Sequence, residues 1–97
     1  MSARIPSHPG SLLREIVIPA LDKPITTIAK EIGLSRQMLH RIMREEAPVT
    51  PDTAVRFGKY FGNGPNLWLN MQLHHDLAVA QKALAGEIKK IPTVKAT

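Results

Sequence analysis

The stretch that decides the fold is ITTIAKEIGLSRQMLHRIMR, residues 25–44. Its apolar residues recur at helical spacing in two short segments. In the first segment Ile28 and Ile32 are four residues apart, so they share one face of a helix. In the second segment Leu39 and Ile42 are three residues apart and share a face in the same way. The spacing therefore predicts two consecutive helices, each with one apolar side.

The residues between these segments fit a tight turn. Gly33 can adopt the left-handed backbone conformation that a side chain with a Cβ resists. Ser35 follows as an N-cap, because its hydroxyl can accept a hydrogen bond from the first turn of the second helix. Ala29 is small enough for the two helices to cross there, and Leu34 adds an apolar side chain. The stretch therefore predicts a helix-turn-helix.

The outer face of the second helix is polar and basic. It contains no acid and consists of Arg36, Gln37, His40, Arg41 and Arg44. Such a helix can lie in the major groove of DNA. The whole chain has 13 Lys and Arg against 8 Asp and Glu, a net charge of +5, which also favours a polyanionic partner. These features predict DNA binding.

Length and composition limit the classes of protein to which this chain can belong. A chain of 97 residues is long enough for one small domain. It has no cysteine, so disulfides and thiolate chemistry are excluded. No apolar run suggests a signal peptide or a membrane span, and a cytoplasmic protein is expected.

Helix signals also flank the central stretch. His8 and Pro9 would open a first helix, which should end before Pro19 because a residue preceding proline avoids the helical region. Its expected apolar stripe is Leu12, Leu13, Ile16 and Val17. Thr50 and Pro51 would open a fourth helix that ends near Gly62. The residues of that helix expected to point inward are Ala54, Phe57 and Phe61.

A fifth helix should run from Gly64-Pro65 to about Ala85 and be closed by Gly86. Trp68 is expected to seal the core. The distal part carries more apolar surface than a small domain needs, and an exposed apolar patch usually marks a partner. The residues predicted for a dimer interface are Leu73, Leu77, Ala80 and Leu84. The expected organisation is a flexible tail over residues 1–7, an all-α domain over 8–86 and a C-terminal tail over 87–97.

Other chemistry has weak support. His74 and His75 are adjacent, so on a helix they would point about 100° apart, unlike zinc ligands three or four residues apart. Glu45 and Glu46 are consecutive loop acids rather than an oriented acid–base pair. His8 fits a helix cap better than a catalytic role. We therefore expect no catalytic residue, no metal and no cofactor, and a small histidine nuclease is the weakest alternative.

Several motifs together resemble the HigA-type antitoxins, a branch of the phage-repressor-like (XRE) helix-turn-helix family. The matching segments are His8-Pro9-Gly10 with Leu13-Arg14-Glu15, the IAKEIGLSRQ segment, Thr50-Pro51-Asp52-Thr53-Ala54 with Arg56, and Trp68-Leu69-Asn70-Met71-Gln72 with Asp76-Leu77. The resemblance implies a five-helix all-α fold and a homodimer. It also implies binding to palindromic operator DNA in the protein's own promoter and neutralisation of a HigB-type toxin, a ribosome-dependent mRNA endonuclease. A stand-alone dimeric transcriptional regulator without a toxin is the alternative.

The resemblance also apportions roles in DNA binding. Residues expected at base edges are Arg36, Gln37, His40 and Arg41. Arginine suits guanine and glutamine suits adenine. Thr26 and Thr27, at a helix N-terminus, are expected to contact phosphates. Ser35 and Arg44 are expected to contact either a base or a phosphate.

Two regions leave alternatives open. Family members often have an Asn-Gly turn and basic residues after the recognition helix, where this chain has Glu45-Glu46-Ala47-Pro48. Either this loop turns away from DNA or its acids weaken and sharpen binding. The toxin is expected mainly on folded surface away from the recognition helix, first at the N-terminal helix around Arg14 and Glu15 and the tail that precedes it. The second candidate is the apolar part of the C-terminal tail, Ile88, Ile91 and Val94, which would otherwise pack on its own domain.

Overall fold

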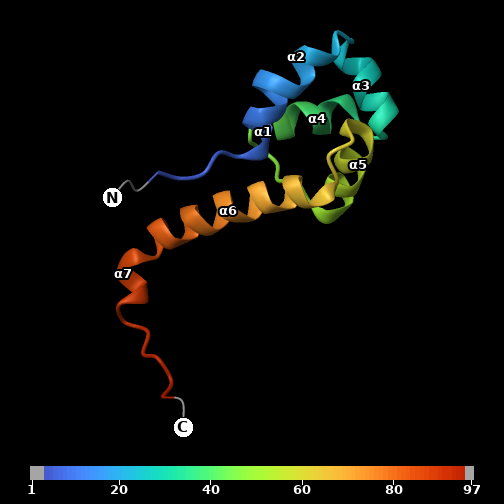
Figure 1. The fold of residues 1–97 in the computed structure, drawn as a ribbon. Coiled ribbons are helices and arrows are strands. Elements are labelled where there is room, and N and C mark those ends of the chain that lie inside the picture. Colours follow the sequence, from blue (N-terminus) through green and yellow to red (C-terminus); the bar gives the residue numbers. More distant parts are fainter. Residues whose placement is uncertain (1–3, 96–97) are drawn as a thin grey trace.

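A computed structural model describes residues 4–95, and within this range the chain contains helices and no strand (Figure 1). In chain order the elements are α1 (Pro9–Leu12), the π-helical turn η1 (Leu13–Val17), α2 (Ile18–Leu21), α3 (Ile25–Ile32), α4 (Arg36–Met43), α5 (Pro51–Phe61), α6 (Pro65–Ala83) and α7 (Ala85–Ile88). The predicted all-α, five-helix fold is confirmed. Its first helix is divided among α1, η1 and α2, and the short α7 is an addition.

The first helix does not end before Pro19, so that prediction was wrong. The N–H of Ile18 donates to the carbonyl of Leu13, five residues back, which makes η1 wider than an α-helical turn. A proline lacks an N–H, and its ring crowds the carbonyl four residues earlier in an α-helix. We attribute the continuation of the helix across Pro19 to the wider turn that precedes it. Ile16, which was expected to point inward, lies in this wider turn and is 64% exposed.

The helix-turn-helix forms as predicted, from local hydrogen bonds. Gly33 ends α3 with φ of 87°, and its N–H donates to the carbonyl of Ala29 at 2.9 Å. The hydroxyl of Ser35 accepts from the N–H of Met38 at 3.0 Å, which caps α4. Thr50 caps α5 by accepting from the N–H of Thr53.

One core joins α1 and η1 to the four helices α3, α4, α5 and α6. Its fully enclosed apolar side chains include the predicted residues Leu13, Ile28, Leu39, Ile42, Ala54, Phe57 and Trp68. The rings of Phe57 and Trp68 meet edge to face with centroids 5.2 Å apart. The indole N–H of Trp68 donates to the Asn63 side chain at 2.9 Å, so no polar atom of the ring is left unpaired. Trp68 therefore seals the core, as predicted.

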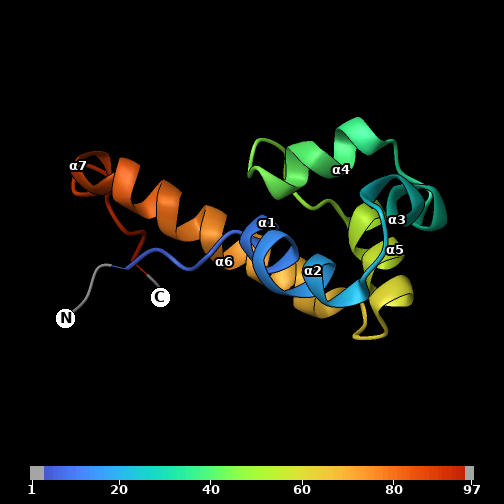
Figure 2. The ribbon, with the colours of Figure 1, turned by 90° about the horizontal axis from the view of Figure 1, so that it is seen from above.

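The distal half of α6 leaves this core (Figures 1 and 2). Leu73, Leu77 and Leu84 are 58%, 50% and 49% exposed. The helix ends at Ala83 with Leu84 as its C-cap, and Gly86 lies inside α7 instead of closing α6 as expected. No helix among residues 4–95 is long and apolar enough to cross a membrane.

Both ends of the described chain lie near or beyond α6. The segment before α1 lies beside α6 in both views, where the His75 ring N–H donates to the Pro6 carbonyl at 2.8 Å. Residues 1–3 of the predicted N-terminal tail lie outside the described residues. At the other end, Ile88, Ile91 and Val94 are 48%, 68% and 91% exposed, so the alternative in which they pack on the domain was wrong.

Candidate nucleic-acid interface

The candidate DNA-reading surface is one side of α4, which lies at the edge of the molecule in Figure 2. At about 100° per residue, its polar residues fall within an arc of roughly 140°, opposite the buried Leu39 and Ile42. They are Arg36, Gln37, His40, Arg41 and Arg44, of which His40 is half-buried and the others are exposed. Because Leu39 and Ile42 are enclosed, the fold fixes which side of α4 faces solvent.

Arg36 and Gln37 lie in the first turn of this surface. Within residues 4–95 neither side chain takes part in an ion pair or side-chain hydrogen bond. Their donors are therefore available to an incoming ligand without the loss of an internal contact. The Ser35 hydroxyl, by contrast, is already engaged by the N–H of Met38, which limits what it can offer to DNA.

The start of α3 offers a second set of donors. Its N-cap is Pro24, which makes no side-chain capping bond. The first N–H groups of a helix have no partner within the helix, so this end suits an anion such as phosphate. Thr26 and Thr27 lie in that first turn and are exposed, as a phosphate-contacting role requires.

Arg56 of α5 clamps the turn between α3 and α4. Its Nη1 donates to the carbonyls of Ile32 at 3.3 Å and Gly33 at 3.5 Å. Its Nε pairs with Asp52 Oδ1 at 2.7 Å, one helical turn earlier. The guanidinium thus satisfies carbonyls at the end of α3 and ties the turn to α5. This role was not predicted, although the i,i+4 spacing of Asp52 and Arg56 was an available signal in the sequence.

The HPG motif holds the other end of α4. The Nδ1 of His8 accepts the N–H of Gly10 at 2.9 Å and so caps α1, as expected. Burial lowers the pKa of His8 below its ordinary value, while the nearby Glu45 acts in the opposite direction. Gly10 packs against the carbonyl of Ile42, where a Cβ would overlap the backbone. The glycine therefore allows α1 to lie directly on the recognition helix, a role not predicted.

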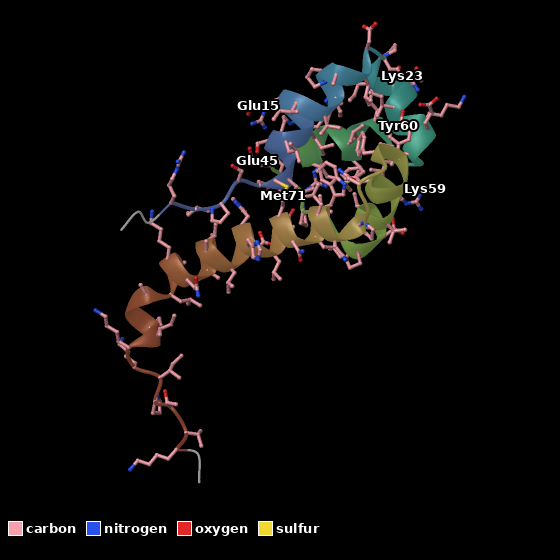
Figure 3. The ribbon with its side chains drawn as sticks, viewed as in Figure 1. Glu15, Lys23, Glu45, Lys59, Tyr60 and Met71 are labelled. Atoms are coloured by element: carbon pink, nitrogen blue, oxygen red, sulfur yellow. The ribbon has the colours of Figure 1, made fainter. Side chains whose placement is uncertain are left out.

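Arg14 of η1 holds the loop after α4 in place. Arg14 donates to the Met43 carbonyl at 2.6 Å, and it pairs with Glu45 at 3.3 Å and with Glu15 at 2.9 Å. Figure 3 shows Glu15 and Glu45 on the same side of the molecule, where the first helix meets the end of α4. These carboxylate contacts raise the pKa of Arg14, chiefly through the hydrogen bond to Glu15. Both candidate toxin-contacting residues, Arg14 and Glu15, are thus engaged with each other.

A further ion pair lies at the opposite side of the domain, where Figure 3 labels Lys23 and Tyr60. Glu31 accepts from the Tyr60 hydroxyl and pairs with Lys23 at 3.0 Å. The hydrogen bond from Tyr60 lowers the pKa of Glu31, and the same bond raises the pKa of Tyr60. The hydrogen bond between Tyr60 and Glu31 ties α5 to α3, and the ion pair ties Lys23, just before α3, to the same carboxylate.

The remaining polar cluster does not form a metal site. A shallow hollow of about 200 Å³ is lined by His8, Glu45, Glu46, Ala47, Pro48, Gln72, His75 and Asp76. The rings of His8 and His75 meet edge to face at 5.2 Å. Among residues 4–95 no three His, Asp or Glu side chains are placed to share a metal ion. The polar side chains of this hollow serve caps and helix contacts instead.

Comparison with known proteins places this geometry in a family. No family model matches the chain. Virulence-associated protein I of Dichelobacter nodosus is 37% identical over 75 residues, which cover 77% of this chain and 69% of the relative. An addiction-module antidote protein of the HigA family from Coxiella burnetii has a known structure. It superposes with a TM-score of 0.84 at 30% identity, covering 95% of this chain and all of that one. The chain belongs to the HigA family.

A further HigA-family structure includes DNA. The Pseudomonas aeruginosa antitoxin HigA, solved with the higBA promoter, has a TM-score of 0.84 at 28% identity and covers 94% of this chain and 99% of that one. The resemblance predicted from the HPG, TPDTA and WLNMQ segments is therefore confirmed.

Proposed function

We propose that this chain is an antitoxin that binds operator DNA as a homodimer, represses its own operon and neutralises a HigB-type mRNA endonuclease. The observation that carries the proposal is the exposed, acid-free side of α4, which is oriented by a buried apolar side. We assign base contacts to Arg36, Gln37, His40 and Arg41. We assign phosphate contacts to Thr26, Thr27 and Arg44, with Ser35 mainly a cap. A cytoplasmic location belongs to the same proposal.

The distal part of α6 supports the dimer. At about 100° per residue, Leu73, Leu77, Ala80 and Leu84 fall on the side of α6 opposite Trp68. Trp68 faces the core of its own chain, whereas these four residues are exposed to solvent. We propose that a second copy covers them. Two-fold dimers of this kind read half-sites about 34 Å apart, one turn of DNA.

DNA binding and dimerisation can be tested together. We expect a solution mass of two chains at micromolar concentration, and two chains bound to a duplex taken from upstream of the chain's own gene. The Leu77→Asp variant should sediment as a monomer and bind that duplex more weakly, because a carboxylate would be buried without a partner. The matched control is Val55→Asp, at a site 61% exposed in α5. A parent protein with the mass of one chain, with or without DNA, contradicts this proposal.

Toxin binding needs its own experiment. We expect the product of the adjacent gene to co-purify with this chain and to lose its mRNA-cleaving activity in the complex. The exposed Ile88, Ile91 and Val94 are one docking candidate, so deletion of residues 88–97 tests that surface while operator binding should stay within a few-fold of the parent. An adjacent product that neither co-purifies nor cleaves mRNA would favour the alternative, a stand-alone regulator. Catalysis by this chain itself is not part of the proposal.

A further inference from the structure

The end of the recognition helix has an unusual residue at its turn. The N–H of Glu46 donates to the carbonyl of Arg41 at 2.8 Å, and the N–H of Glu45 donates to that of Ile42 at 3.0 Å. This pair of bonds is the Schellman arrangement, in which a glycine or asparagine usually takes the left-handed position. Here Glu45 takes it, with φ of 64°. A glutamate in this conformation costs free energy that glycine would not.

The turn brings the next residue back along α4. The Glu46 carboxylate lies 3.3 Å from the Nε of Arg44, and the Glu46 carbonyl accepts from Arg41 at 3.3 Å. The side chains of Arg44 and Glu46 are each 56% exposed. Glu46 therefore engages the two arginines at the C-terminal end of the candidate DNA surface. Arg36 and Gln37, at the other end, have no such partner within residues 4–95.

The contrast between the engaged arginines at one end of α4 and Arg36 and Gln37, unpaired within residues 4–95, at the other affects how the helix would bind DNA. Sequence-independent affinity comes from Lys and Arg that replace counterions at phosphates. An arginine already paired with a carboxylate must exchange that partner before it can pair with phosphate, and an exposed pair is weak enough to exchange. We propose that Glu46 is an intramolecular competitor for DNA phosphate that restrains Arg44. It thereby limits sequence-independent binding and leaves the unpaired Arg36 and Gln37 to dominate recognition. This inference rests on the proposed DNA-binding function.

The test compares the parent with Glu46→Gln on two duplexes over a series of KCl concentrations. One duplex comes from upstream of the chain's own gene, and the other has the same bases in shuffled order. Because exposed ion pairs are weak, we expect E46Q to bind the shuffled duplex about threefold to fivefold more tightly per protomer. The slope of log affinity against log salt should steepen by about 0.9 per protomer, as for one added phosphate contact.

Two further comparisons test whether Glu46 affects DNA binding through Arg44. In an Arg44→Ala background, E46Q should have no effect, because the arginine that it releases is absent. Glu87→Gln is the matched control: it removes one carboxylate that pairs with Lys90 at 3.8 Å in and after α7, far from α4 (Figure 1). This variant should bind both duplexes as the parent does.

Each outcome has one meaning. An unchanged E46Q affinity, or an equal gain in the R44A background, overturns the competition between Glu46 and phosphate. The second result would mean that the carboxylate acts on phosphate directly. A parent protein that binds neither duplex rejects the proposed function instead, so the two failures are distinguishable.

Discussion

Replacing Trp68 with alanine is expected to lower the free energy of unfolding by about 3–5 kcal/mol, the cost typical of emptying an enclosed aromatic site. Trp68 is fully buried, its ring lies 5.2 Å from Phe57 and 5.5 Å from Phe61, and its N–H has a partner. The variant loses these contacts and leaves the side chain of Asn63 without its donor. A domain of this size has a total stability of about 5–15 kcal/mol, so a large fraction would be lost.

Urea unfolding followed by circular dichroism would measure this effect, at one protein concentration because dimerisation adds to apparent stability. The matched control is Val55→Ala in α5, where the side chain is 61% exposed. Surface changes of this kind usually alter stability by about 0.5 kcal/mol or less. A Trp68→Ala variant as stable as Val55→Ala would show that α5 and α6 do not depend on this contact.

Replacing Arg36 or Gln37 with alanine is expected to weaken operator binding by about 1–3 kcal/mol per half-site, and twice that for a dimer on both half-sites. Discrimination between bases at the contacted position should relax as well. Both side chains are exposed in the first turn of α4 and lack an internal partner within residues 4–95. Their removal should therefore leave the free energy of unfolding almost unchanged.

Competition binding with operator duplexes altered one base pair at a time would measure both affinity and discrimination. Lys82→Ala, near the end of α6, removes the same charge from an exposed site and serves as the control for Arg36→Ala. It should weaken binding to all duplexes slightly and equally. Variants at Arg36 and Gln37 that read the operator as selectively as the parent would refute the assignment of this surface.

Predictions from sequence succeeded where the interactions are local. The caps at Ser35 and Thr50 join residues three apart, and the turn at Gly33 depends on the backbone freedom of one residue. The exposed, basic side of α4 followed from spacing alone, because burial of Leu39 leaves the opposite side of the helix in solvent. The end of the first helix was mispredicted because the rule for proline assumes an α-helical turn, whereas a π turn precedes Pro19.

The sequence by itself therefore determined the helix-turn-helix, the basic side of its second helix and the family, since these depend on neighbouring residues and their order. Only the tertiary structure decided how the motif is held. Arg56 reaches the carbonyl of Ile32, and Gly10 meets the carbonyl of Ile42, which are 24 and 32 residues away along the chain. It also decided that Glu46 turns back to Arg44. Such contacts depend on distances in space, which local spacing does not encode.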